Sequence, residues 1–363
     1  MDYAARQRCL QAALERDELD LLLITHLPNV RYLCGFTGSA GALLIGDRGA
    51  TFFTDGRYAA QARAEVSAAR VVIARKAPWL AAAEYLADSG KAHGRKAALG
   101  FEAESVTVAT RERIAAVLRS KFKLRSAPPL VERARTVKDA AEIRRIRRAV
   151  ELGASLFQTA LKRIRPGVSE LEVAAAMEYE ARRAGAESMS FPTIVAAGKR
   201  SAVVHGRASQ APIPQRGFVV CDFGVILAGY CSDRTRTVYV GRPSPAARRA
   251  YAAVLEAQQA ALDAVRPGVR ASEIDAAARR VLRGQKLARY FTHSTGHGLG
   301  LEIHEAPRLA AGQTQTLEPG MVITVEPGVY IPGRWGVRIE DVVVVTPSGS
   351  EVLKPTEKEL IVV

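Results

Sequence analysis

Apolar runs and amphipathic stretches alternate along the first third of the chain. Short apolar runs predict strands, and apolar residues three or four positions apart predict helices. We expect strands near residues 21–25, 41–45, 51–54 and 97–101, helices near residues 58–65, 79–86 and 108–118, and an extended piece near Pro129. This alternation is typical of a small α/β domain.

The pattern changes near residue 130. Residues 126–129 break the periodicity, and from Ala140 a long amphipathic helix carries Ile143, Ile146 and Val150 between arginines. Because such breaks mark domain boundaries, we expect an N-terminal α/β domain over residues 1–130 and a second domain over residues 131–363.

The second domain contains a weak internal repeat. The sequence Arg-Pro-Gly-Val occurs at Arg165 and again 101 residues later at Arg266, and an acidic, apolar helix start follows each copy. The unit is too long for a solenoid repeat and too short for a separate domain. It predicts two related halves of one domain, with a site between them that takes residues from both.

Composition and charge narrow the function classes. The chain has 48% hydrophobic and 25% charged residues and a formal net charge of +15, which excludes a disordered chain. The arginines are scattered along predicted helices. This pattern is more typical of solvated helix faces than of a nucleic-acid binding site. Without a signal peptide or a membrane-length apolar run, and with four unpatterned cysteines, we expect a soluble, cytoplasmic protein with reduced thiols.

Four acidic residues lie in apolar, strand-like surroundings. A buried carboxylate is costly unless a positive group or a cation accompanies it. These residues come from different predicted strands, and the first two flank a hairpin that turns at Ala228 and Gly229: Asp222, Asp233, Glu326 and Glu340. A lone acid of this kind usually pairs with a buried arginine, but four within one domain favour a metal site.

A glycine-rich loop between these acids holds His293, His297 and His304, three of the six histidines of the chain. The glycines that flank His297 allow close backbone approach to a bound group. One imidazole with four carboxylates can hold two divalent ions about 3.5 to 4 Å apart, with Mn, Co, Fe and Zn all possible. The sequence lacks the patterns of dinucleotide loops, P-loops, serine hydrolases and zincins.

Five segments together resemble the signature of the pita-bread dinuclear metallopeptidases over residues 137–363. They are Asp222-Phe-Gly, Ser232-Asp-Arg-Thr-Arg-Thr, Gly296-His-Gly-Leu-Gly, Glu326-Pro-Gly and Arg338-Ile-Glu-Asp. Residues 32–41 and 53–58 resemble the extra N-terminal domain of the Xaa-Pro peptidases, aminopeptidase P and prolidase. The resemblance implies an α+β protein, with a duplicated pita-bread catalytic domain preceded by a smaller creatinase-type α/β domain.

The resemblance also implies roles for individual residues. Asp222 would chelate one metal, Asp233 and Glu340 would bridge both, and His297 and Glu326 would complete the other. His205 would line the substrate pocket, and His293 and His304 would lie near the scissile carbonyl. The remaining polar residues of the signature, Arg338 and Thr235, are expected to support the ligands from a second layer.

We therefore expect a metal-dependent aminopeptidase that releases the N-terminal residue from peptides with proline at the second position. A bridging hydroxide would attack the scissile carbonyl, Glu326 would carry the proton, and the two divalent ions would be Mn first, with Co, Zn or Fe as alternatives. The alternatives are a prolidase restricted to Xaa-Pro dipeptides and an inactive pita-bread protein used for binding. We expect a homodimer that acts on proline-containing peptides, with no nucleic-acid or membrane partner.

Overall fold

The computed structural model describes residues 1–88, 97–119 and 121–363. The chain divides into two compact units, Met1–Arg135 and Thr136–Val363. The division falls a few residues after the boundary expected near residue 130, because the segment after Pro129 forms a helix of the first unit.

The N-terminal unit is built on a mixed six-stranded sheet with the strand order β4-β3-β2-β1-β5-β6. Its apolar core contains Leu23, Leu44, Phe53, Leu99 and Ile114. The elements are α1 (Tyr3–Arg16), β1 (Leu21–Ile24), α2 (Leu27–Cys34), β2 (Ala42–Gly46), β3 (Gly49–Asp55), α3 (Ala59–Glu65), β4 (Arg70–Ala74), α4 (Pro78–Asp88), β5 (Ala97–Glu102), α5 (Val108–Leu118), β6 (Phe122–Ala127) and α6 (Leu130–Thr136).

All strands and helices predicted for this unit are confirmed to within two residues, but the extended piece near Pro129 is wrong. The strand β6 ends at Ala127, and Pro129 directly precedes α6, where its carbonyl oxygen accepts a hydrogen bond from Arg133 N at 3.0 Å. Proline lacks an N–H and is tolerated at a helix start, where that donor has no intrahelical partner. The sequence pattern also missed α1, α2, β4, β6 and α6.

The first half of the C-terminal unit places two helices beside short antiparallel strands. Phe157, Val173, Val195 and Val219 belong to its apolar core. The elements are α7 (Ala140–Arg163), α8 (Glu170–Arg183), β7 (Ser188–Met189), β8 (Ile194–Ala197), the 3-10 turn η2 (Gly198–Ala202), β9 (Gly217–Phe223), β10 (Val225–Leu227), β11 (Tyr230–Cys231) and β12 (Arg234–Val240). Residues 228 and 229 both have positive φ and form the predicted hairpin turn between β10 and β11.

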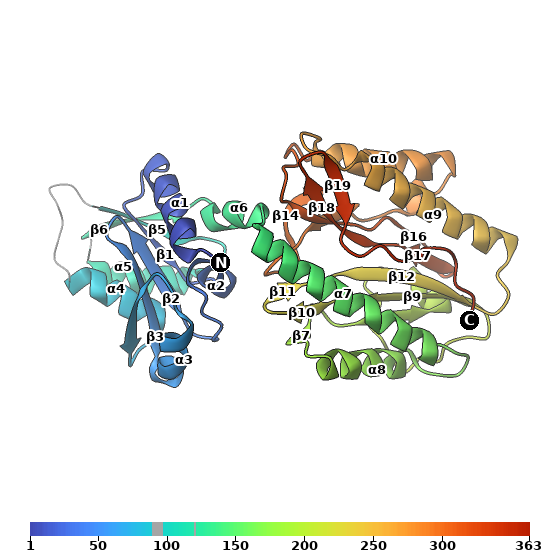
Figure 1. The fold of residues 1–363 in the computed structure, drawn as a ribbon, viewed down its shortest axis with the longest axis horizontal. Coiled ribbons are helices and arrows are strands. Elements are labelled where there is room, and N and C mark those ends of the chain that lie inside the picture. Colours follow the sequence, from blue (N-terminus) through green and yellow to red (C-terminus); the bar gives the residue numbers. More distant parts are fainter. Residues whose placement is uncertain (89–96, 120) are drawn as a thin grey trace. The chain divides into compact units, whose positions relative to one another are not determined.

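The second half repeats this arrangement with its own helix pair and a five-stranded sheet of order β14-β13-β15-β18-β19. The elements are α9 (Pro245–Ala264), α10 (Ala271–Gly284), η3 (Ala288–Tyr290), β13 (Gly296–Gly298), β14 (Glu305–Leu309), β15 (Val322–Val325), β16 (Gly328–Ile331), β17 (Trp335–Arg338), β18 (Asp341–Thr346) and β19 (Gly349–Val352). In Figure 1 the strands of this unit lie between α7 and α8 on one side and α9 and α10 on the other.

The two Arg-Pro-Gly-Val segments have the same local structure. Gly167 and Gly268 adopt left-handed conformations, with φ of 86° and 80°, which glycine tolerates without a steric cost. Gly167 N donates to Ile213 O at 2.9 Å, and Gly268 N donates to Leu317 O at 2.8 Å. A helix follows each turn, so the predicted duplication is confirmed at the level of individual hydrogen bonds.

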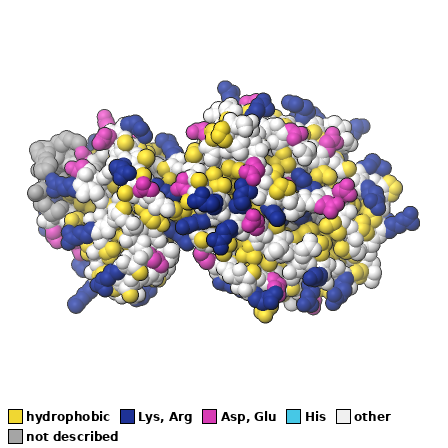
Figure 2. Space-filling view, viewed as in Figure 1, with side chains coloured by type: hydrophobic (Ala, Val, Ile, Leu, Met, Phe, Trp, Pro, Cys, Tyr) yellow, Lys and Arg dark blue, Asp and Glu magenta, His cyan; other side chains and the backbone are white. Residues whose placement is uncertain are grey.

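The surplus of positive charge is dispersed on the face that Figure 2 shows. Lys and Arg side chains are spread over this face, with Asp and Glu side chains between them, which is the pattern of ordinary solvated surfaces. Among the described residues, no helix combines the length and apolar character needed to cross a membrane.

Candidate metal centre

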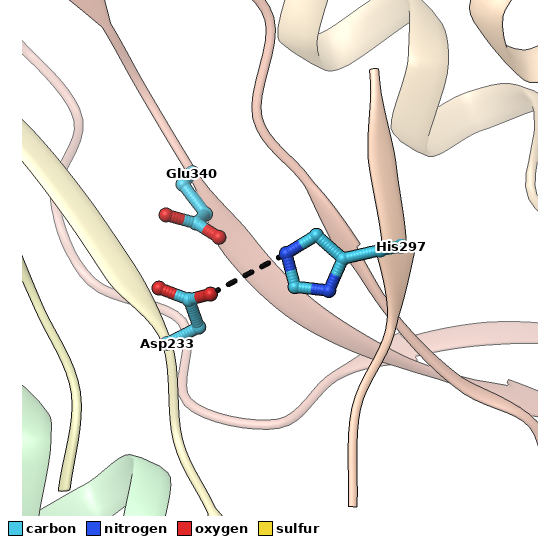
Figure 3. A group of neighbouring side chains, drawn as sticks. All are labelled: Asp233, His297 and Glu340. Carbon is cyan, nitrogen blue, oxygen red and sulfur yellow. Dashed lines mark ion pairs between the residues drawn. The ribbon is translucent and has the colours of Figure 1, made fainter. Parts of the chain in front are cut away.

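The four acids and the histidine that the sequence indicates as ligands come from five places in the C-terminal unit. Asp222 lies in β9, Asp233 directly precedes β12, His297 is the middle residue of β13, Glu326 follows β15, and Glu340 directly precedes β18. Ligand atoms of Asp233, His297 and Glu340 lie within 4.8 Å of one another. Figure 3 shows these three side chains pointing toward one another from separate segments.

The hydrogen bonds of His297 present one ring nitrogen to the acids. Nδ1 lies 2.9 Å from Gly298 O, and since a carbonyl only accepts, Nδ1 must carry the proton. The lone pair is then on Nε2, which lies 3.5 Å from Asp233 Oδ2 and 3.5 Å from Glu326 Oε1. Burial, followed by the nearby His304, lowers the pKa of His297 to about 4. A neutral imidazole with a fixed tautomer is the form that binds metals.

The electrostatics of the acids favour the binding of a cation. Burial and then the charge of Glu340 raise the pKa of Asp233 and of Glu326 well above their ordinary values. Burial and then Asp222 raise the pKa of Glu340 to about 8. Like charges in a buried site oppose ionisation, and a divalent cation reverses that effect. The set of oxygen-rich ligands with one imidazole therefore fits divalent metal ions.

Arg338 and Thr235 hold one oxygen of each of two acids. Arg338 Nη2 donates to Asp222 Oδ2 at 2.5 Å, and Thr235 Oγ1 donates to Glu340 Oε2 at 2.8 Å. Arg338 Nε in turn donates to Thr235 Oγ1 at 3.0 Å. In the described part of the chain, the other oxygens, Asp222 Oδ1 and Glu340 Oε1, are buried without a hydrogen-bond partner. Buried polar atoms rarely stay unpaired, so these two oxygens fit metal ligands.

The other three histidines of the predicted site, His205, His293 and His304, differ in their surroundings. His304 is exposed, and its ring lies 4.4 Å from that of His297 at an interplanar angle of 74°. His205 is also exposed. Burial is the main cause of the lowered pKa values of His293 and His304, and the charge of His205 adds to both. The structure therefore places His304 against His297, and places His205 near enough to both His293 and His304 for their charges to interact.

His293 is hydrogen bonded at both ring nitrogens. Nδ1 lies 2.8 Å from Ser294 O, and Nε2 lies 3.0 Å from the hydroxyl of Tyr330. Because Ser294 O only accepts, Nδ1 carries the proton and Nε2 accepts from the Tyr330 hydroxyl. Arg338 Nη1 in turn donates to that hydroxyl at 2.5 Å. Burial and then Arg338 lower the pKa of His293 to about 3, and the ring is neutral at physiological pH.

The sequence interpretation missed two residues of this network. Tyr330 connects Arg338 to His293, and Thr324 Oγ1 accepts a hydrogen bond from His297 N at 3.0 Å. A usable signal existed for Tyr330, because it lies two residues after the Glu326-Pro-Gly segment. Thr324 gave no signal, since a threonine in a buried strand is unremarkable in sequence.

Comparison with known proteins gives consistent matches over the whole chain. The Xaa-Pro dipeptidase from Bacillus anthracis is 40% identical, with a TM-score of 0.94 and full coverage of both chains. A Xaa-Pro dipeptidase of Pyrococcus horikoshii is 36% identical, over 96% of each chain. The X-Pro aminopeptidase from Thermotoga maritima is 34% identical, with a TM-score of 0.89 and 99% coverage of each chain.

Two family descriptions cover the two units separately. Residues 6–137 match the creatinase/prolidase N-terminal domain, and residues 144–347 match metallopeptidase family M24. The expected pita-bread fold with a creatinase-type N-terminal domain is thereby confirmed, as is the expected peptidase class. The chain belongs to metallopeptidase family M24.

Proposed function

We propose that this metallopeptidase hydrolyses the peptide bond that precedes proline, with Xaa-Pro dipeptides as its first substrate class. The observation that carries the proposal is the ligand cluster, in which Asp222 and Glu340 each keep one buried oxygen unpaired while Arg338 and Thr235 hold the other. The relatives named above as Xaa-Pro dipeptidases support the substrate class.

Five residues would hold two divalent cations. We assign Asp222 to one cation, Asp233 and Glu340 to both, and His297 Nε2 and Glu326 to the other. When bound, such a pair acidifies a water molecule and polarises the substrate carbonyl. Because the ligands are mostly carboxylates, we propose Mn²⁺ first, with Co²⁺, Zn²⁺ and Fe²⁺ as alternatives.

Glu326 would also move the proton that the reaction requires. Its side chain is partly exposed while Glu340 is almost fully buried, so Glu326 has room for a substrate beside it. Its carboxylate would take a proton from the attacking water and pass it to the leaving nitrogen. The leaving nitrogen of proline is a tertiary amide without an N–H, so it cannot donate a hydrogen bond to the protein, and it needs this proton to leave as an amine.

His205, His293 and His304, here called the substrate-side histidines, would form the wall that faces the peptide. His205 and His304 are exposed and would contact the substrate directly. His293 has both ring nitrogens engaged, so we propose that it shapes the wall through Tyr330. We also propose that the enzyme acts as a homodimer.

A second candidate is the Xaa-Pro aminopeptidase that the sequence favours. The Thermotoga maritima neighbour supports it, but the dipeptidase relatives support the dipeptidase at least as well. The substrates of the two activities differ in the group that follows the proline ring. A dipeptide ends in the proline carboxylate, whereas a longer peptide has a neutral amide at that position.

A peptide series of increasing length separates the two candidates. We would measure kcat/KM for Ala-Pro, Ala-Pro-Ala and Ala-Pro-Ala-Ala with Mn²⁺, and with Ala-Ala as the control without proline. Turnover of Ala-Pro alone supports the dipeptidase. Comparable turnover of all three proline peptides contradicts it and supports the aminopeptidase, and turnover of none contradicts the proposed function.

A further inference from the structure

Outside the metal cluster, an ion pair between a buried acid and a partly exposed arginine holds the loop that carries His293. Asp275 in α10 has a side chain only 1% exposed and pairs with Arg279 Nε at 2.7 Å. The same guanidinium donates to Phe291 O at 3.0 Å and to His293 O at 2.6 Å. Thr295 Oγ1 donates to Asp275 Oδ1 at 2.8 Å. The pair therefore holds the backbone before, at and after His293.

The first half of the unit holds the loop of His205 in a comparable way. Glu170, at the start of α8, has a fully buried side chain and pairs with Arg200 Nε at 2.9 Å. Ala197 N donates to Glu170 Oε1 at 2.8 Å, and Ser209 Oγ donates to Oε2 at 2.7 Å. One carboxylate thus joins the two ends of the segment that contains His205.

Arg200 adds a further bond inside that segment. Its Nη2 donates to Arg207 O at 2.8 Å, two residues after His205. In both halves an acid on the second helix of the half pairs with an arginine, and the arginine donates to the backbone of the loop. Each half of the unit therefore uses an acid on its second helix to anchor one histidine loop.

The loop of His304 has a third anchor. Lys138 Nζ pairs with Glu305 Oε2 at 3.0 Å, and the two side chains are 1% and 7% exposed. Glu302 N donates to Glu305 Oε1 at 3.1 Å, so the loop folds back on this carboxylate. The space is tight, because a Cβ added at Gly300 would lie 2.7 Å from Glu305 Oε1.

From these contacts we propose that the pairs Asp275–Arg279, Glu170–Arg200 and Lys138–Glu305 are positioning pairs, each of which fixes the loop of one substrate-side histidine. The inference rests on the proposed function, because it gives these histidines their role at the substrate. None of the six residues belongs to the ligand cluster, and their hydrogen bonds go to the loops that carry the histidines. The side chains of Arg279 and Arg200 are 27% and 39% exposed. Ion pairs that are open to solvent contribute little net stability, so positioning explains the placement of these two pairs better than stabilisation does.

The sharpest variant is Arg279→Lys. Lysine keeps the positive charge beside Asp275 but lacks the planar fork that reaches two carbonyl oxygens at once. We expect kcat for Ala-Pro to fall about 10- to 100-fold, as for a small misplacement of a reacting group, with bound metal unchanged. The matched control is Arg183→Lys in α8, whose guanidinium bonds to Glu180 in an exposed pair, and kcat should stay within about twofold there.

A double-mutant cycle separates positioning from a general structural role. In a His293→Ala background, Arg279→Lys should change kcat by less than about twofold, because the group that it positions is gone. A full additional loss in that background overturns the proposal for this pair. Glu170→Gln, which keeps the volume, should instead act mainly through KM, since His205 lines the pocket, and a change in kcat alone contradicts the proposal.

A spectroscopic measurement needs no turnover and therefore separates this inference from the proposed function. In ¹⁵N-histidine-labelled, metal-loaded protein, His293 should show a protonated Nδ1 and an unprotonated Nε2, assigned with His293→Ala. Arg279→Lys should convert this to an average of two tautomers. An unchanged spectrum contradicts the positioning role even if Ala-Pro is cleaved, and a changed spectrum supports it even if no peptide is cleaved.

Discussion

Glu102 in the N-terminal unit and Glu340 in the C-terminal unit are both buried glutamates, but their oxygens have different partners. Glu102 Oε2 accepts from Thr25 N at 2.7 Å and His26 N at 2.8 Å, and Oε1 accepts from Asn29 Nδ2 at 2.7 Å. Glu340 Oε2 accepts from Thr235, whereas Oε1 has no hydrogen-bond partner among the described residues.

The difference shows what each carboxylate contributes. Burial raises the pKa of Glu102 as well, but hydrogen bonds from three donors oppose that rise and tie a strand end to the start of α2. In the cluster, burial and then the charges of neighbouring acids raise the pKa values of Asp233, Glu326 and Glu340. A chain does not gain stability from such an arrangement, so its acids fit a function that supplies positive charge from outside the chain.

The largest expected effect is the loss of a shared ligand. Asp233→Asn and Glu340→Gln keep the side-chain volume but remove a charge that two cations would share. Each should lower kcat for Ala-Pro by several orders of magnitude and reduce the metal content measured by elemental analysis.

Glu102→Gln is the matched control for that prediction. It should leave metal content and kcat unchanged and lower the free energy of unfolding by about 1 to 3 kcal/mol, because a buried hydrogen-bond acceptor is impaired. A loss of metal in Glu102→Gln, or two bound metals in Glu340→Gln, would contradict the different roles assigned to the two glutamates.

A smaller effect is expected at His304. It lies against His297 and is exposed, so His304→Ala should leave metal content near two and lower kcat by about 10²- to 10⁴-fold, as for loss of a group that assists proton transfer or charge stabilisation. Metal loss in this variant with normal kcat per bound metal would show that His304 is a ligand and that the residue roles are misassigned.

Replacing proline by alanine in the substrate should lower kcat/KM by a smaller factor than His304→Ala lowers kcat. Alanine restores an N–H and removes the ring, and we expect kcat/KM for Ala-Ala to be about 10- to 200-fold below that for Ala-Pro, the range for one lost apolar contact. Equal values for the two peptides would indicate a general dipeptidase.

The smallest expected effect is the pH dependence of stability without metal. The pKa of Glu340 is raised in the folded state to about 8, so the folded protein binds more protons than the unfolded chain between the ordinary glutamate pKa and about 8. Stability of the metal-free protein should therefore fall as pH rises through this window. Thermal unfolding should show a shallower fall for Glu340→Gln, and an equal or steeper fall would contradict the pKa assignment.

The sequence indicated the clustered acids and His297 better than the network around them. The five residues proposed as ligands belong to short motifs with restricted spacing, whereas Tyr330 and Thr324 take part through contacts between distant segments. In the N-terminal unit, α1 was missed because one of its buried residues is Gln7. Its amide donates to Leu33 O at 2.9 Å, and a polar residue on the buried face hides the helical pattern.

The anchors of the histidine loops were equally invisible in sequence. Asp275 and Arg279 are four residues apart on α10 and look like an ordinary surface pair. Only the fold shows that Asp275 is buried and that Arg279 reaches the loop of His293. The Arg-Pro-Gly-Val turns, in contrast, depend on glycine at a left-handed position, a local requirement that sequence does reveal.

One titration tests the central claim that the cluster holds two divalent cations required for hydrolysis. Protein stripped with a chelator would receive Mn²⁺ in steps, with bound metal and Ala-Pro hydrolysis measured on the same samples. The account predicts no detectable hydrolysis without metal and full activity at two ions per chain. It also predicts that Glu340→Gln reaches neither two bound ions nor full activity. Full hydrolysis in a sample shown to be free of metal would contradict the account.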